Sequence, residues 1–145
     1  MKTSIKISEV EHDDLVNLFS TALYGNSSFG CECTHAAREK VWELGDCYED
    51  ILAKIILSGG EVKIIDLYSE SEDDIYGNNP SVYWDEDYEH MVYPITLKDI
   101  ISGLELAANN GQSNRVMKLM NDDVSFDMID ADVLLQYICY ENIIY

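Results

Sequence analysis

The residues with the greatest capacity for chemistry lie between Ile64 and Leu97, a stretch without lysine or arginine. Carboxylates and aromatic rings are interleaved along it, unlike the apolar-poor composition of a disordered acidic tail. Aromatic rings beside charge on a folded frame are typical of surfaces that bind other proteins. We therefore predict a partner-binding surface made of Glu70, Glu72, Asp73, Asp74, Tyr83, Trp84, Asp85, Glu86, Asp87, Tyr88 and Glu89.

The acids alternate with other residues at two places in this stretch, which suggests a more specific hypothesis about the partner. The alternating sets are Glu70, Glu72 and Asp74, and then Asp85, Asp87 and Glu89. On a strand, each set projects from one face at intervals of about 6.6 Å. A polynucleotide backbone also presents regularly spaced negative charge, so such a row fits the basic cleft that a nuclease or effector keeps for DNA or RNA. A solvated acidic loop explains the same composition equally well.

The cysteines offer ligand types for one zinc site, with the set Cys31, Cys33, His35 and Cys47. Their spacing is unlike that of the common CxxC knuckles, and free cysteine is among the most buried residue types. Ordinary packing is therefore the favoured interpretation. We expect no bound metal and no cofactor.

Calcium binding and catalysis have weaker support. Asp85, Asp87 and Glu89 begin a calcium-loop spacing, but His90 replaces the expected glycine and Thr96 the closing glutamate. A thiol enzyme needs a histidine base, and no local motif pairs any cysteine with His12, His35 or His90. The sequence also lacks a glycine-rich phosphate loop, HExxH and GxSxG. The prediction is a protein without enzyme activity.

Net charge narrows the class of partner. The 145 residues carry a formal charge of −19, which repels nucleic acid and anionic membranes and attracts basic proteins. No apolar run approaches the roughly 18 residues of a membrane span, and residues 1–10 lack the apolar core of a secretion signal. Four cysteines without an export signal indicate reduced thiols. The expectation is a cytoplasmic protein that binds neither nucleic acid nor membrane directly.

Apolar periodicity and turn residues divide the chain into the elements that must position these groups. Helices are predicted after the caps Ser8, Asp46, Thr96 and Asp130, and over Ala36–Leu44 and Gln112–Asp123. The first three caps have the spacing of a capping box with the acid three residues on, which is Glu11, Glu49 and Asp99 in turn. Gly25, Gly59–Gly60 and Asn109–Gly111 are expected to end the first, third and fourth of them in chain order. Strands are predicted over Ser4–Ser8, Phe29–Thr34, Val62–Tyr68 and Ile143–Tyr145.

The acidic stretch itself is expected to form a long hairpin or loop insertion over about residues 69–93. Its turn is placed at residues 77–80, where Gly, Asn and Pro gather, and its return limb runs over Val82–Ile95. Pro94 indicates an edge or a departure from the sheet. With neither repeat nor linker, residues 1–145 are predicted to form a single α+β domain: a small antiparallel sheet with three to four helices packed on it.

Several short patterns along most of the chain resemble a family of small acidic accessory proteins encoded by phages, prophages and plasmids of gut bacteria. The matching pieces are Asp13-Asp14-Leu15-Val16, Ala22-Leu23-Tyr24-Gly25, Gly59-Gly60, Leu97, Gly103, Asp130-Ala131-Asp132 and Gln136-Tyr137-Ile138. The resemblance implies a mobile-element accessory protein, and it brings no catalytic residues.

Together these observations lead to one functional hypothesis and two alternatives. The first is inhibition of a host nucleic-acid-handling defence complex, such as a CRISPR effector or a restriction enzyme, in the host cytoplasm. The partner would then be a basic nucleic-acid-binding host protein, and the chain a monomer or small homo-oligomer. One alternative is a module that binds a nucleotide signal through tyrosines and Arg115 or Lys118. The other is a structural phage protein that assembles through its sheet edge.

Overall fold

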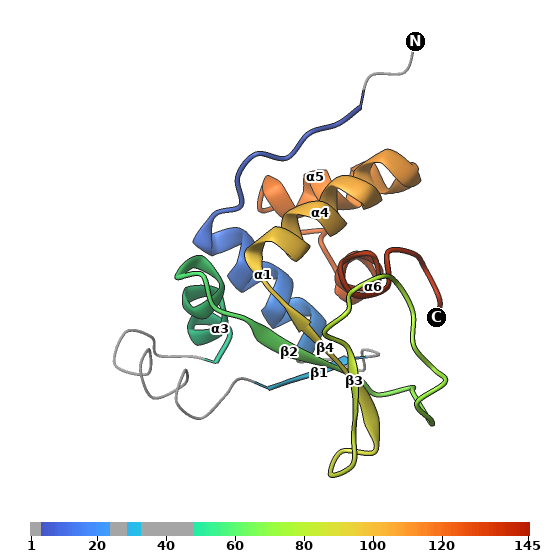
Figure 1. Cartoon of the computed structure of the whole chain (residues 1–145). Coiled ribbons are helices and arrows are strands. Elements are labelled where there is room, and N and C mark those ends of the chain that lie inside the picture. The colour runs from blue at the N-terminus through green and yellow to red at the C-terminus, as the bar shows by residue number, and fades with distance from the viewer. Residues whose placement is uncertain (1–3, 24–28, 33–47) are drawn as a thin grey trace.

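A four-stranded antiparallel sheet lies along one side of a group of helices (Figure 1). The computed structural model describes residues 4–23, 29–32 and 48–145. The predicted class, a small antiparallel sheet with helices packed on it in a single α+β domain, is confirmed. In chain order the elements are α1 (His12–Leu23), β1 (Phe29–Glu32), α3 (Tyr48–Leu57), β2 (Val62–Asp66), β3 (Tyr83–Asp85), β4 (His90–Ile95), α4 (Leu97–Ala107), the π-helical turn η1 (Ala108–Gln112), α5 (Ser113–Met120) and α6 (Met128–Tyr140).

The centre of the sheet is the pair β2 and β4 in the strand order β1-β2-β4-β3. Ile64 of β2 lies opposite Tyr93 of β4, and Val62 lies opposite Ile95. All four side chains are fully or almost fully buried, as expected where β-branched and aromatic residues meet across strands. This packed pair is the rigid base from which the acidic segment leaves and to which it returns.

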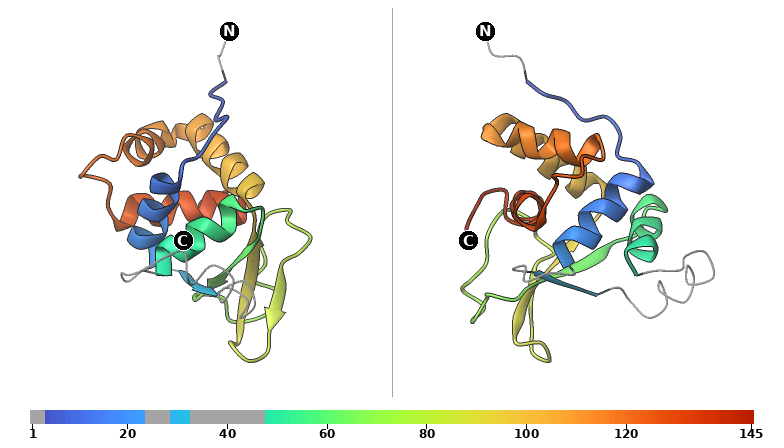
Figure 2. Two further views of the ribbon diagram at one scale, coloured as in Figure 1. Left: turned by 90° about the vertical axis from the view of Figure 1, so that its left-hand side faces the viewer. Right: turned by 180° about the vertical axis from the view of Figure 1, so that it is seen from behind.

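The helices cover this sheet through apolar residues at helical spacing. In α1 the buried residues include Leu15, Leu18 and Phe19, and in α3 they include Ile51 and Leu52. Figure 2 shows α1 between α3 and α6, and α1 contacts both helices. The periodicity that predicted these two helices therefore also identified the faces that they bury.

Two of the expected helix starts differ from the structure. The box of Thr96 and Asp99 at the start of α4 is present as predicted. The last helix begins at Met128, because Asp127 is its cap and Asp130 is the third helical residue of the same box. The prediction that Asp130 itself caps the helix is thus wrong by three residues.

The first helix also begins later than the capping box that was predicted for its start. That box paired Ser8 with Glu11, whereas α1 starts at His12. Asp14 Oδ2 accepts a hydrogen bond from the Glu11 N–H at 2.9 Å, which satisfies one of the free donors at a helix start. The acceptor is therefore supplied from within the helix.

The predicted strand at Ser4–Ser8 is not formed. Side chains replace a neighbouring strand: Asn109 Oδ1 accepts from the Ile5 N–H at 2.8 Å, and Asn109 Nδ2 donates to the Ile5 carbonyl at 3.0 Å. Glu105 Oε1 accepts from the Ile7 N–H at 2.7 Å. The alternation of apolar residues here reflects an extended segment bound to a helix.

The predicted strand at Ile143–Tyr145 is also absent, and Gln136 of α6 explains why. Its Oε1 accepts from the backbone N–H groups of Ile144 and Tyr145, each at 2.8 Å. Its Nε2 donates to the Tyr145 carbonyl at 3.3 Å. A buried glutamine thus supplies the bonds that a strand partner would have made.

Three expectations fall outside the described residues: the stop at Gly25, the helix over Ala36–Leu44 and the cap at Asp46. The short helix expected within Gln112–Asp123 is confirmed as α5, with Val116 and Leu119 buried. The chain turns from α4 into α5 through η1, where Gly111 has a φ of 85°. A glycine adopts this left-handed conformation without the steric cost that a side chain brings.

Candidate functional site

The predicted binding residues fall into two groups that extend from the central strands. One group lies in the acidic loop, which we define as residues 69–82, and the other lies in the β3–β4 hairpin with its tip at residues 86–89. Figure 1 shows the hairpin extending away from the helices and the acidic loop passing near the end of α6. The exposed members are Glu70, Glu72, Asp73, Glu86, Asp87, Tyr88 and Glu89, and the half-buried ones are Asp74, Tyr83, Trp84 and Asp85.

The acidic loop folds around the side chain of Asp74. Its Oδ2 accepts from the Glu70 N–H at 2.7 Å and from the Ser71 N–H at 3.3 Å. The Asp74 N–H in turn donates to the Ser71 carbonyl at 3.0 Å. One carboxylate therefore closes the turn, and the side chains of Glu70, Glu72 and Asp73 remain exposed around it.

Asp85 plays the same part at the hairpin tip. Its Oδ1 accepts from the Asp87 N–H at 2.9 Å and from the Tyr88 N–H at 3.0 Å, an arrangement typical of aspartate in turns. The Glu89 N–H donates to the Asp85 carbonyl at 2.8 Å, and Glu89 has a φ of 56°. The turn at residues 86–89 is thus fixed by its own first acid.

These turns contradict the hairpin form of the prediction, with a row of carboxylates on each limb, whereas residues 69–82 do form a loop, which was its other form. Residues 67–82 form no strand, and β3 ends at Asp85, so Asp87 and Glu89 lie in the turn that follows. The expected turn at residues 77–80 is replaced by the one at residues 86–89. The physical reason is that Asp74 and Asp85 bind backbone N–H groups, which favours turns over extended strands. The acids form two compact clusters and no regular row.

Both acidic turns are attached at one place through Ser69. Its Oγ donates to the Asp66 carbonyl at 2.6 Å and accepts from the Met91 N–H at 2.7 Å. His90 Nδ1 lies 2.9 Å from the Ser69 carbonyl, to which it donates in the Nδ1–H tautomer. Because Ser69 precedes Glu70 and His90 follows Glu89, the two clusters start from neighbouring backbone positions.

The far end of the acidic loop is attached to α6. A Cβ atom on Gly77 would lie 3.1 Å from the carbonyl oxygens of Cys139 and Tyr140. Asn78 Nδ2 donates to Glu141 Oε2 at 2.8 Å, and Asn79 Nδ2 donates to the Pro94 carbonyl at 2.8 Å. The acidic loop is therefore attached at both ends, and Glu141 extends its charge onto α6.

Pro94 predicted an edge strand or a departure from the sheet, but β4 is an inner strand, and its pairing with β2 continues through Ile95. The strand is open at Pro94 on its other side only. β3 pairs only with residues 90–92 of β4. On that side Pro94 lies beyond the last paired residue, so its missing N–H breaks no hydrogen bond between strands. The contact from Asn79 occupies that position instead.

A cluster of tyrosines packs beneath the acidic loop. The ring of Tyr140 lies 5.4 Å from that of Tyr76, 5.0 Å from Tyr93 and 5.9 Å from Tyr145, measured between centroids. Tyr145 Oη donates to Asp66 Oδ2 at 3.0 Å. Burial, and then the neighbouring Asp66 carboxylate, raise the pKa of Tyr140 far above its ordinary value. The hydroxyl of Tyr140 therefore stays neutral. Tyr76 packs edge-on against Tyr140 and Tyr145.

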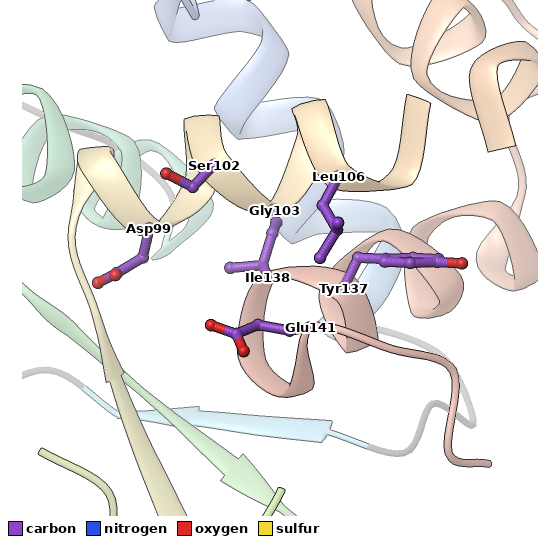
Figure 3. A pocket seen from close by; sticks show the side chains of 7 residues that line it. All are labelled: Asp99, Ser102, Gly103, Leu106, Tyr137, Ile138 and Glu141. Atoms are coloured by element: carbon purple, nitrogen blue, oxygen red, sulfur yellow. The ribbon is translucent and has the colours of Figure 1, made fainter. Parts of the chain in front are cut away.

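A groove between α4 and α6 adjoins this surface. It has a volume of about 460 Å³ and is lined by Asp99, Ser102, Gly103, Leu106, Tyr137, Ile138 and Glu141. Figure 3 shows Asp99 on α4 and Glu141 just beyond α6, with Gly103 and Ile138 facing each other between the two helices. Sequence reasoning named Asp99 only as a capping residue and did not consider Glu141. The available indication was Gly103, because a glycine inside a helical pattern often marks a close contact.

The basic residues named for a nucleotide site are already paired. The guanidinium of Arg115 contacts Asp130 Oδ1, and Lys118 Nζ lies 3.5 Å from Asp130 Oδ2. Arg115 Nε also donates to Gln112 Oε1 at 2.9 Å. Burial raises the pKa of the Asp130 carboxyl, but the Asp127 N–H and the two cations outweigh it and hold that pKa below its ordinary value. The carboxylate therefore stays ionised and neutralises much of the positive charge that a phosphate needs.

The predicted zinc ligands are not tested by this structure. Cys33, His35 and Cys47 lie outside the described residues, as does the side chain of Cys31. Within residues 4–23, 29–32 and 48–145, no three His, Cys, Asp or Glu side chains gather in a way that would hold a metal ion. Two of the histidines considered as bases contact other groups: His12 Nε2 lies 2.6 Å from Asp50 Oδ1, and His90 binds Ser69.

Comparison with known proteins returns no match, whether with family models, with curated proteins or with solved structures. In the part of the chain that the structure describes, no helix has the length and apolar character needed to cross a membrane.

Proposed function

We propose that this chain is a non-enzymatic interaction protein that binds a basic, nucleic-acid-binding protein through the two acidic turns. The observation that carries the proposal is their attachment to a single buried residue, Ser69, on the packed centre of the sheet. A partner-binding surface gains affinity when its loops are ordered before binding, because less conformational entropy is lost. A merely solvated loop has no need of that order.

Charge supports the choice of partner class. No lysine or arginine occurs from Ile64 to Leu97, and the whole chain carries a charge of −19. Such a surface attracts a basic protein over about 8 Å at physiological salt and farther at low salt. Acids clustered on turns fit separate basic patches better than the continuous basic cleft that binds a polynucleotide. We therefore propose that each acidic turn contacts a separate basic patch on the partner.

The class of target follows from the sequence resemblance to mobile-element accessory proteins. Within this proposal the chain acts in the cytoplasm of a bacterial host, and its partner belongs to a defence complex that handles nucleic acid, such as a CRISPR effector or a restriction enzyme. Occupying a basic patch of that complex would block access of DNA or RNA. The nucleotide-binding alternative is disfavoured, because Arg115 and Lys118 are both paired with Asp130.

The test is affinity capture from a lysate of a gut bacterium at low and at high salt, with identification of the captured proteins. Glu86→Lys/Asp87→Lys reverses two exposed charges of the hairpin tip without touching Asp85, which holds the turn. Glu9→Lys/Glu61→Lys is the matched control, since it changes net charge equally at exposed sites outside the acidic stretch.

The expected result is capture of a basic nucleic-acid-binding protein that weakens with salt, is lost with the hairpin variant and is kept by the control. Addition of the wild-type chain should also release that protein from DNA or RNA. Capture that the hairpin variant keeps, or that both variants lose equally, would show that the two turns are not the binding surface.

A further inference from the structure

The groove between α4 and α6 has a shape that depends on one residue. Gly103 approaches α6 so closely that a Cβ atom there would lie 2.4 Å from Ile138 Cα. The groove beside this contact is lined by Leu106, which is half-buried, and by Ile138, which is 6% exposed. In the view of Figure 3, the carboxylates of Asp99 and Glu141 lie on one side of the contact between Gly103 and Ile138, and Leu106 lies on the other side.

Each carboxylate of the groove is oriented through one oxygen. Asp99 Oδ2 accepts from the Thr96 N–H at 2.9 Å and from Thr96 Oγ1 at 3.1 Å. Glu141 Oε2 accepts from Asn78 Nδ2 at 2.8 Å. Among the described residues, Asp99 Oδ1 and Glu141 Oε1 accept no hydrogen bond. Both acids are therefore held in place, and each keeps a free acceptor.

The end of α6 adds negative potential to the same place. The last carbonyl groups of a helix lack partners within it, and the helix dipole places partial negative charge there. Glu141 caps this 13-residue helix with a φ of 63°, a position at which glycine is usual. Both the backbone and the dipole disfavour a glutamate here, and acids kept against such costs are frequent at binding sites.

We infer that this groove receives an arginine side chain of the basic partner. A guanidinium has donors for two carboxylates, and it is weakly hydrated, so its flat face can lie against the half-buried Leu106. A lysine ammonium is more strongly hydrated and gains less from contact with an apolar side chain. That the arginine comes from a protein rests on the proposed function, and the hydrogen bond between Asn78 and Glu141 makes the groove continuous with the acidic loop.

The inference is tested without the partner, by NMR titration of the full chain with the peptide acetyl-Gly-Arg-Gly-amide. Its citrulline analogue, which has the same shape without the charge, is the ligand control. Asp99→Asn/Glu141→Gln keeps the acceptors for Thr96 and Asn78 but removes both charges. Glu9→Gln/Glu61→Gln removes two charges at exposed sites elsewhere.

The arginine peptide should shift the backbone amides of Ser102, Gly103, Ile138 and Glu141, and the citrulline peptide should not. The groove variant should weaken binding at least about tenfold, and the control less than about twofold. Shifts confined to residues 70–74 and 86–89, or equal binding by the two variants, would overturn the inference. If the capture experiment fails and the peptide titration succeeds, the proposed partner is wrong and the arginine site stands. If the capture experiment succeeds and the titration fails, the partner stands and the arginine site is wrong.

Discussion

Replacing Gly103 by alanine places a methyl group at the closest contact between α4 and α6. The new Cβ would lie 2.4 Å from Ile138 Cα and 2.8 Å from Ile138 N. These are backbone atoms that no rotamer change can move. The helices must separate by about 1 Å to bring the shorter distance to the 3.4 Å of an ordinary contact.

Two opposing effects set the size of the change. Glycine to alanine inside a helix normally stabilises by about 1 kcal/mol. Overpacking costs about 1–3 kcal/mol, and here it lies at the upper end, because separating the helices also loosens their other contacts. The expected net loss is about 2 kcal/mol in the free energy of unfolding, which lowers Tm by about 4–8 °C for a chain of this size.

Urea unfolding followed by circular dichroism measures this loss. Ser102→Ala is the matched control, because Ser102 is the exposed neighbour on the same helix and its replacement should stabilise by about 0.5 kcal/mol. If Gly103→Ala proves as stable as the wild type while Ser102→Ala behaves as expected, the tight contact between the two helices does not exist as described.

Three further substitutions probe the cap of α6, a buried acid and the tyrosine cluster. Glu141→Gly relieves the strain of the left-handed backbone and should raise the free energy of unfolding, measured in urea, by about 1 kcal/mol. It should also weaken the binding of the arginine peptide. A loss of stability would show that the strain argument is wrong. Burial raises the pKa of Asp14 despite the Glu11 N–H, so ionised Asp14 opposes folding at neutral pH and the opposition fades as pH falls through that raised pKa. Asp14→Asn, which keeps the acceptor, should therefore be more stable than the wild type at pH 7, with a gap that closes in unfolding curves toward pH 4; a constant gap would contradict this. Tyr145→Phe removes the hydrogen bond to Asp66 Oδ2 and should cost about 1 kcal/mol at pH 7, less than a fully buried charged bond because Tyr145 is 41% exposed; an unchanged unfolding midpoint would show that the bond adds nothing.

Much of the fold follows from apolar spacing alone. The buried residues of α1, α3 and α5 repeat at helical intervals, and the β-branched run of β2 predicts the central strand. The sequence also predicts the box of Thr96 and Asp99, since both of its members are local. Local patterns of this kind do not depend on the rest of the molecule.

The errors come from polar side chains that bind backbone groups elsewhere in the chain. Asn109 and Gln136 replace strand partners for two extended segments, and Asp74 and Asp85 close turns where strands were predicted. Nothing in the residue types alone tells which backbone group such a side chain will meet. The groove has the same origin, because the contact of Gly103 with Ile138 joins residues that are far apart in the sequence.

The bridge formed by Ser69 also has a mechanical consequence. It ties the end of β2 to the start of β4 through a residue that is 1% exposed, so a load applied to either acidic turn passes directly into the central strand pair of the sheet. A partner bound to both turns would be held at two places on its surface, and both places are anchored to the sheet through the same residue, Ser69. Under traction we expect the bound complex to part at its contact surface before the loop peels from the sheet.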